Sequence, residues 1–220
     1  MSILQPLPRP PADTQGLSDV HREQAQAITE ICQPPDHALI VGVGAGHGTP
    51  MASVIALNPT WRGIQLEHDP DIVDTWAALQ SCGLADRCEI RRAHVNRRPP
   101  QGAHLYLLAD VSRSEHWTRD HLIDLLDPIG EAMPPGGWLA IVDTMPPDPP
   151  PDDASCSCGE NDPCEDRCPK FAHPRRPLPG TKWSLADYLH MLHPMHLELH
   201  LVKPLSHAFT LLALRKSRHP

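Results

Sequence analysis

The sequence predicts a single α/β domain whose mostly parallel, seven-stranded sheet ends in an antiparallel hairpin. A chain of 220 residues with 40% hydrophobic side chains suits one core with some length left for tails or an insert. Between residues 38 and 143, apolar runs alternate with segments of helical periodicity. This alternation is typical of a parallel sheet covered on both faces. The last two apolar runs have so short a join, 204–206, that they must pair as an antiparallel hairpin.

Each strand of the parallel part is predicted from a short apolar run, because strands buried on both faces read as nearly continuous hydrophobic segments. The runs are 38–43, 61–67, 88–94, 103–109 and 138–143. A helix over 18–32, capped by Ser18 or Asp19, precedes the first strand and ends before Pro34. After that strand, Thr49 and Pro50 read as a cap and a first-turn proline that open the next helix.

Two further helices lie between strands and one follows them. Asp69 and Pro70 open a helix that is expected to end at Gly83 and to bury a stripe formed by Ile72, Val73, Trp76 and Leu79. The segment 119–133 is helical in pattern, and Pro128 within it predicts a kink or a break. Ser184 and Asp187 have the spacing of a capping box at the start of a helix over 184–193. The hairpin strands are expected over 195–203 and 207–215.

The chain therefore divides into four parts. We expect residues 1–16 to form a flexible Pro-rich arm and 17–145 to form the α/β core. Residues 146–180 are a Pro- and Cys-rich insert without periodicity, and 181–220 complete the core with a helix and the hairpin.

Charge and hydropathy exclude two classes of partner. The formal net charge of −8 argues against nucleic acid, and the Arg91, Arg92, Arg97 and Arg98 cluster reads as a solvated strand edge. No apolar run approaches the ~20 residues that span a bilayer, and the N-terminus does not resemble a secretory signal. We therefore expect a cytoplasmic protein that does not bind membranes.

A glycine-rich loop follows the first strand, in the segment 38–48. Gly42, Gly44, Gly46 and Gly48 permit tight turns and close approach of a ligand, and the following helix directs its N–H groups at the loop. Such a loop alone is a weak signal, since many α/β turns need glycines only for packing. Glu67 ends the second strand about 20 residues later, where an acid accepts the ribose hydroxyls of an adenosine ligand. An NAD fingerprint requires glycine at position 47, which is His, so the pattern favours the methyltransferase form of the loop.

From residue 38 to 143, the chain resembles the C-terminal catalytic domain of bacterial small-molecule O-methyltransferases. The resemblance is carried by VGVGAGHG (41–48), NPTWRGIQLE (58–67), GLADRCE (83–89), GAHLYLLA (102–109), Trp117 and EAMPPGGWLAIVD (131–143). It implies a Rossmann-like class I methyltransferase fold and S-adenosyl-L-methionine (SAM) as cofactor. The implied cofactor-binding residues are Gly42, Gly44, Gly46, Glu67, His94, Val95 and Ala109.

The chain also departs from this family. Only about 37 residues precede the first strand, where the family has a helical half that dimerises and covers the substrate. His94 replaces a common Asp, and Glu115 occupies the place of the catalytic His of plant members. His116, next to Trp117, is the first candidate for a base, followed by Glu115 and Asp110, and a plain surface His116 is the alternative. A homodimer or a partner protein is expected to cover the open substrate side.

Four cysteines of the insert lie within thirteen residues: Cys156, Cys158, Cys164 and Cys168. Four thiolates at this range can surround one tetrahedral Zn²⁺, with His173 as a substitute ligand, and the alternative is an acidic loop with free thiols. Cys32, Cys82 and Cys88 are expected to be small buried hydrophobes.

The sequence thus predicts a SAM-dependent methyltransferase that transfers a methyl group to an oxygen of a small, natural-product-like acceptor. Survival of all four loop glycines favours a working enzyme. The alternative is a non-methylating or degenerate protein of this fold that serves as a partner subunit, with the cysteine insert as a docking module.

Overall fold

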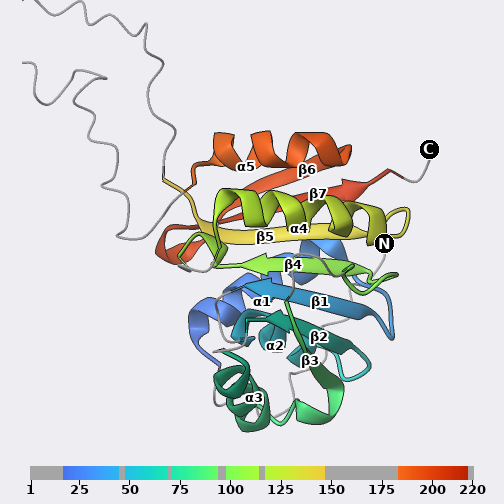
Figure 1. Ribbon diagram of the computed structural model, residues 1–220. Coiled ribbons are helices and arrows are strands. Elements are labelled where there is room, and N and C mark those ends of the chain that lie inside the picture. Colours follow the sequence, from blue (N-terminus) through green and yellow to red (C-terminus); the bar gives the residue numbers. More distant parts are fainter. Residues whose placement is uncertain are drawn as a thin grey trace, which may run out of the picture.

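The structure, a computed structural model, describes residues 17–44, 48–68, 71–93, 98–113, 117–146 and 183–217. Within these residues one seven-stranded sheet has the order β3-β2-β1-β4-β5-β7-β6 (Figure 1). Strands β1 to β5 pair in parallel, whereas β7 is antiparallel to both β5 and β6. The predicted fold class is therefore confirmed. The strands are β1 (Leu39–Gly44), β2 (Arg62–Glu67), β3 (Cys88–Arg92), β4 (Leu105–Ala109), β5 (Trp138–Thr144), β6 (Leu197–Pro204) and β7 (Phe209–Lys216).

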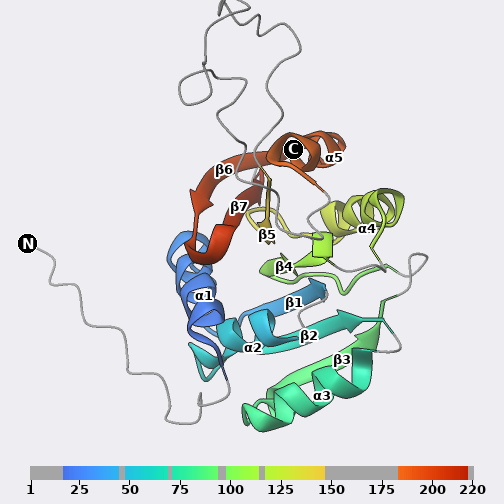
Figure 2. The same ribbon diagram turned by 90° about the vertical axis from the view of Figure 1, so that its left-hand side faces the viewer.

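Helices cover both faces of the sheet (Figure 2). On one face, buried side chains of the first three helices pack with Ile40, Leu105 and Leu107. On the other face, the last two helices pack with Val41 and Tyr106. Because strand residues alternate between faces, neighbours such as Ile40 and Val41 belong to different cores. The helices are α1 (Asp19–Cys32), α2 (Thr49–Ala56), α3 (Ile72–Ser81), α4 (Arg119–Ala132) and α5 (Leu185–Leu192).

Several predicted helix ends are present. Ser18 caps α1 by accepting a hydrogen bond from the backbone N–H of His21. The capping box of Ser184 and Asp187 opens α5, with both reciprocal hydrogen bonds formed. Gly83 follows α3 with φ +65°, a left-handed conformation that glycine adopts without steric cost.

Two helix predictions were wrong. The cap of α2 is Gly48, in a left-handed conformation, and Thr49 is already inside the helix. The apolar stripe of α3 is not buried as expected, because Val73 is 73% exposed and Trp76 is 43% exposed. Thr75 and Leu79 are the buried residues of this helix. Helix α3 covers the β3 end of the sheet and has no further layer of described residues outside it, so its outer positions meet solvent.

Two other predictions also need correction. Helix α4 continues through Pro128 to Ala132, so the break that was one of the two predicted outcomes is absent, and the kink stays a prediction. Its apolar face is buried on both sides of the proline, which offsets the one backbone hydrogen bond that proline removes. The first hairpin strand, expected over 195–203, is β6 at 197–204; its pairing with β7 has a register shift between Leu199 and Leu201, and both side chains are exposed at the sheet edge.

The position of a ligand site follows from the strand order. The chain runs from β1 outward to β2 and β3, then crosses to β4 on the other side of β1. The crevice between the carboxyl ends of β1 and β4 is thus the topological switch point, where open α/β sheets bind their ligands. No helix in the described part of the chain is both long and apolar enough to cross a membrane.

Candidate functional site

Three predicted cofactor residues end neighbouring strands at the switch point. Gly44 ends β1 and lies in register with Ala109, the last residue of β4. Glu67 ends β2, the neighbour of β1 on the other side. Parallel strands place their carboxyl ends at one edge, so these three positions share the edge that the resemblance implied.

The loop glycines are required by the protein itself. A Cβ on Gly42 would overlap the amide oxygen of Gln65, and one on Gly44 would overlap the backbone oxygen of Ala109. Gly48 has φ +70°, which disfavours any other residue. Packing and backbone geometry therefore require glycine at these three positions with or without a cofactor, so their presence does not by itself indicate a working enzyme.

Glu67 is a buried acid with polar neighbours. Its carboxylate Oε2 accepts hydrogen bonds from Nε2 of Gln65 at 3.2 Å and from Oγ1 of Thr75 at 3.3 Å. Only 1% of the residue is exposed, and burial raises the pKa of Glu67 to about 7, against the opposing effect of the Gln65 hydrogen bond. A carboxylate held by neutral donors at a strand end can accept hydrogen bonds from a ligand's hydroxyl groups when it is ionised.

A second acidic pair lies at the ends of β4 and β5. Asp143 is buried and accepts hydrogen bonds from the backbone N–H of Ser112 at 2.9 Å and from the hydroxyl of Tyr188 at 2.6 Å. Asp110 follows β4 in a left-handed conformation, φ +55°, with Nε of Arg113 3.7 Å from its carboxylate. Burial, and then the nearby Asp143 carboxylate, raise the pKa of Asp110. Asp110 is thus at the switch point, as a candidate base must be.

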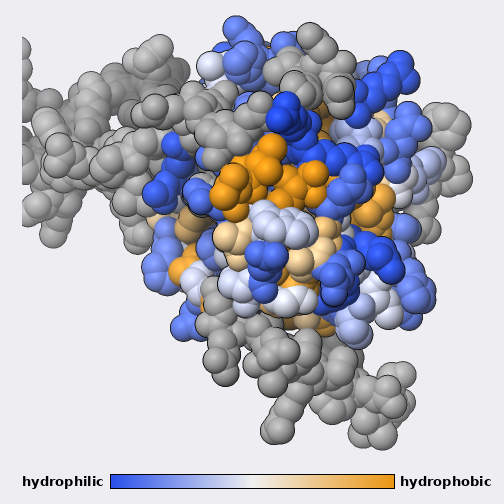
Figure 3. Space-filling view, turned by 60° about the horizontal axis from the view of Figure 1, so that its bottom comes forward, coloured by the Kyte–Doolittle hydropathy of each residue, from blue (hydrophilic) through white to orange (hydrophobic). Residues whose placement is uncertain are grey.

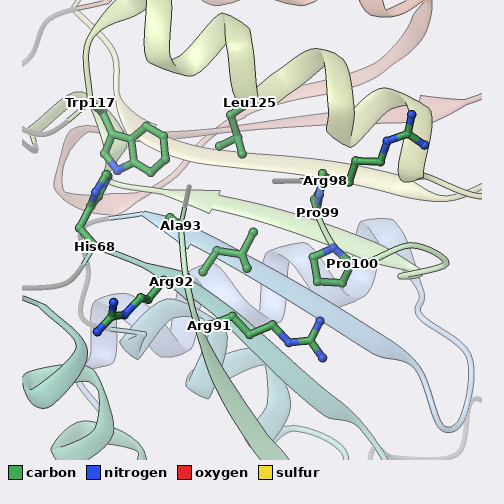
Figure 4. A pocket seen from close by; sticks show the side chains of 10 residues that line it. His68, Arg91, Arg92, Ala93, Arg98, Pro99, Pro100, Trp117 and Leu125 are labelled. Carbon is green, nitrogen blue, oxygen red and sulfur yellow. The ribbon is translucent and has the colours of Figure 1, made fainter. Parts of the chain in front are cut away.

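A cavity of about 400 Å³ opens beside the Glu67 strand end. It lies on the α4 face of the sheet, between the ends of β2 and β3 and the start of α4 (Figure 4). At one end the rings of His68 and Trp117 meet edge to face, with centroids 4.9 Å apart. The hollow at the glycine loop itself is far smaller, about 10 Å³. The larger cavity is lined by Leu66, His68, Arg91, Arg92, Ala93, Arg98, Pro99, Pro100, Trp117 and Leu125.

Some predicted site residues lie outside the described residues. These are Gly46, His94 and Val95 of the cofactor set, Glu115 and His116 of the candidate bases, and the insert cysteines Cys156, Cys158, Cys164 and Cys168. Among the residues that are described, no group of three or more metal-ligating side chains is close enough to hold an ion. Cys32, Cys82 and Cys88 are buried free thiols, as predicted.

The polar residues that support the two acids were not predicted from the sequence. Gln65 and Thr75 hold Glu67, and Ser112 and Tyr188 hold Asp143. One signal was available, because Gln65 precedes Glu67 by two positions and must share its face of a strand. The Tyr188 contact joins residues 45 positions apart and had no local signal.

The fold is a Rossmann-like class I methyltransferase fold, and solved structures agree. The Mitomycin 7-O-methyltransferase MmcR superposes with a TM-score of 0.62 at 24% identity, covering 90% of this chain and 54% of that chain. The pyocyanin biosynthetic protein PhzM superposes with a TM-score of 0.65 at 15% identity, covering 89% of this chain and 55% of that chain. At these identities the likeness establishes the fold alone.

In sequence, the chain is similar to small-molecule O-methyltransferases. It is 35% identical over 108 residues to the mitomycin biosynthesis 6-O-methyltransferase of Streptomyces lavendulae, which is 49% of this chain and 30% of that protein. It is 25% identical over 112 residues to the O-demethylpuromycin-O-methyltransferase of Streptomyces alboniger, 51% and 29% of the two chains. The chain therefore matches about a third of the length of these curated relatives. No family model matches it.

Proposed function

We propose that this protein is a SAM-dependent methyltransferase that acts on a small-molecule acceptor, at oxygen. The observation that carries the proposal is the common position of Gly44, Glu67 and Ala109 at the switch-point edge of a class I methyltransferase fold. The curated relatives, whose names describe O-methyltransferases of natural products, support the same reading.

The residues present fit this cofactor. Glu67 is a buried acid at the end of β2 whose ionised carboxylate can accept hydrogen bonds from ribose hydroxyls, and the next residue, His68, lines the 400 Å³ cavity. The rings of His68 and Trp117, which contact each other edge to face at one end of that cavity, provide aromatic surface for an adenine ring. When bound, SAM supplies a methyl group on a positively charged sulfur, ready for in-line attack by a nucleophile.

The chain's own contribution to chemistry is positioning and proton removal. Holding an acceptor in line with the methyl group makes a bimolecular reaction effectively unimolecular. A phenol or alcohol also needs a base, and we propose His116 first, then Glu115 and Asp110. Of these, Asp110 supports the proposal by its place at the end of β4, with a pKa that burial moves upward toward neutral pH.

The deciding experiment follows conversion of SAM to S-adenosylhomocysteine with a panel of phenolic and hydroxylated acceptors. Turnover that falls when His116, Glu115 and Asp110 are changed to Ala, singly and together, supports the proposal and ranks the bases. Tight binding of SAM without turnover on any acceptor, and with no effect of these variants, contradicts it and leaves a non-methylating partner subunit.

Three further expectations from the sequence are part of the proposal. We propose that the cysteine insert holds zinc in a structural role, that the protein works in the cytoplasm, and that a second chain covers the acceptor side. The second chain is either another copy or a partner protein, and light scattering of the purified protein at several concentrations distinguishes a dimer from a monomer.

A further inference from the structure

The 400 Å³ cavity has two chemically different ends (Figure 4). His68 and Trp117 lie together at the end next to the carboxyl edge of the sheet, where the proposed cofactor enters, and Arg92 lines the cavity on the same side as His68. At the other end, the guanidinium groups of Arg91 and Arg98 lie on either side of Pro100. A cavity of this volume suits a drug-sized ligand, which is more than a purine ring alone.

The far end of the cavity is cationic in a chain that is acidic overall. Arg91 and Arg98 line it, and no Asp or Glu is among the described residues that form its wall. The whole chain carries a formal net charge of −8, so this concentration of positive charge is local. A hollow lined by one sign of charge attracts ligands of the opposite sign.

The two arginines differ in their surroundings. Arg91 pairs with Glu89, with Nε 2.6 Å from Oε1 and Nη2 2.9 Å from Oε2. That bidentate pair fixes the guanidinium plane and leaves the Nη1 donors for another acceptor. Arg98 is exposed and forms no hydrogen bond or ion pair with the described residues. Its charge is therefore uncompensated within that part of the chain.

Between the two ends, the cavity wall is apolar. Leu66 from β2 and Leu125 from α4 line the cavity. Pro99 and Pro100 lie on the side near the arginines (Figure 4). Leu66 and Leu125 are each 6% exposed, so they belong to the packed core and form a fixed surface. Such a wall favours a flat hydrocarbon body over a sugar or a polar chain.

We propose that the Arg91–Arg98 end of this cavity is a binding subsite for a small aromatic acid, with its ring on the Leu66–Leu125 wall and its carboxylate between the two arginines. The subsite goes beyond the proposed methyl transfer, because it requires neither turnover nor bound cofactor. If the cofactor's adenine occupies the His68–Trp117 end, then the aromatic acid is its immediate neighbour.

The test uses 2-naphthoate as the probe and 2-naphthamide as its neutral counterpart, each titrated into the full-length protein by calorimetry. We expect saturable binding of the acid that weakens about fivefold in Arg98→Ala, the effect of losing one exposed ion pair. Arg62→Ala is the matched control, because Arg62 is also exposed but begins β2 at the opposite edge, and it should bind the acid like the wild type.

Glu89→Gln provides a second test, in which binding of the acid is expected to become tighter and not weaker. Removing the carboxylate that compensates Arg91 should tighten binding of 2-naphthoate by a few fold and leave 2-naphthamide unaffected. Equal binding of the acid and the amide, or an unchanged affinity in both Arg98→Ala and Glu89→Gln, would overturn the subsite. Binding of S-adenosylhomocysteine, measured in the same samples, reports separately on the proposed cofactor site, so the two proposals can fail independently.

Discussion

The hydroxyl of Tyr188 donates a hydrogen bond to Oδ2 of Asp143 across 2.6 Å, which links α5 to the end of β5. The same carboxylate accepts the hydroxyl of Ser112 at 2.5 Å, in the turn that follows β4. One buried acid thus joins three segments of the chain next to the switch point. Burial raises the pKa of Asp143, and these hydrogen bonds oppose that effect by favouring its ionised form.

Tyr188→Phe should lower the free energy of unfolding by about 1.5–3 kcal/mol, because it removes a hydrogen bond to a buried charged group. Tyr106→Phe is a suitable comparison, since the Tyr106 hydroxyl donates only to the neutral backbone oxygen of Pro100 and its loss should cost about 1 kcal/mol. Urea denaturation at neutral pH measures both. A smaller loss in Tyr188→Phe than in Tyr106→Phe would contradict the importance given to the Asp143 junction.

The raised pKa of Glu67 predicts that cofactor binding depends on pH. The ionised carboxylate accepts ribose hydroxyls, so affinity for S-adenosylhomocysteine should increase as pH rises through about 7. Glu67→Ala should weaken binding by about ten- to a hundredfold at pH 8, and Glu67→Gln should give a flat profile. Calorimetry between pH 5.5 and 8.5 measures this, with Glu131→Gln as an exposed control. A wild-type profile that is flat over this range would remove Glu67 from the site.

Stability should change with pH in the opposite direction. The folded state keeps the Glu67 proton up to about pH 7, whereas the unfolded chain loses it near the ordinary value of about 4.5. Between these values the folded state binds more protons, so the free energy of unfolding falls as pH rises, by about 2–3 kcal/mol in total. Glu67→Gln should abolish that fall, which chemical denaturation of the two proteins at pH 5 and pH 8 would detect.

Arg87 should be important for stability although it is far from the site. Its Nη1 donates to the backbone oxygens of Asn58 at 2.8 Å and of Ile55 at 3.1 Å, at the end of α2. Arg87→Met keeps the length of the side chain but leaves these carbonyls without their charged donor, so we expect a loss of about 1.5–3 kcal/mol. Arg62→Met, at an exposed position, should change the urea midpoint little. Similar midpoints for the two variants would show that the Arg87 hydrogen bonds contribute little.

A comparison of Gly44 with Gly102 separates the steric cost of adding a Cβ from the cost of the backbone conformation. Both have positive φ, but a Cβ on Gly44 would overlap the backbone of Ala109, whereas a Cβ on Gly102 meets nothing within 4 Å. Gly102→Ala should cost about 1 kcal/mol for its conformation alone. Gly44→Ala should cost about 3 kcal/mol or more, since β1 must move away from β4. Thermal unfolding of both variants gives the comparison, and equal losses would refute the steric reason.

Zinc in the cysteine insert stays a prediction from the sequence. Elemental analysis of protein purified without chelator should give about one zinc per chain, because four thiolates fill a tetrahedral site. Changing Cys156 and Cys158 together to Ser should remove the metal, whereas Cys32→Ser, at a buried thiol in the core, should retain it. A metal-free wild type would leave the free-thiol interpretation of the insert.

Local sequence determined the elements and their order. Apolar runs, caps and turn residues act over a few positions, so β1, the Ser184 capping box and the turn at Gly83 could be read directly. The antiparallel ending followed from the length of one connection, because 204–206 is too short for the crossover that parallel strands need. The position of Glu67 at a strand end also followed from local pattern.

Only the tertiary structure decided what surrounds each element. The exposure of Val73 and Trp76 depends on whether another layer covers α3, and the need for glycine at position 44 depends on a carbonyl of the neighbouring strand. The junction of Asp143 with Tyr188 and the cavity between Trp117 and Arg98 join segments that are distant in sequence. Periodicity reports which side of an element is apolar, but packing decides which neighbour, or solvent, that side meets.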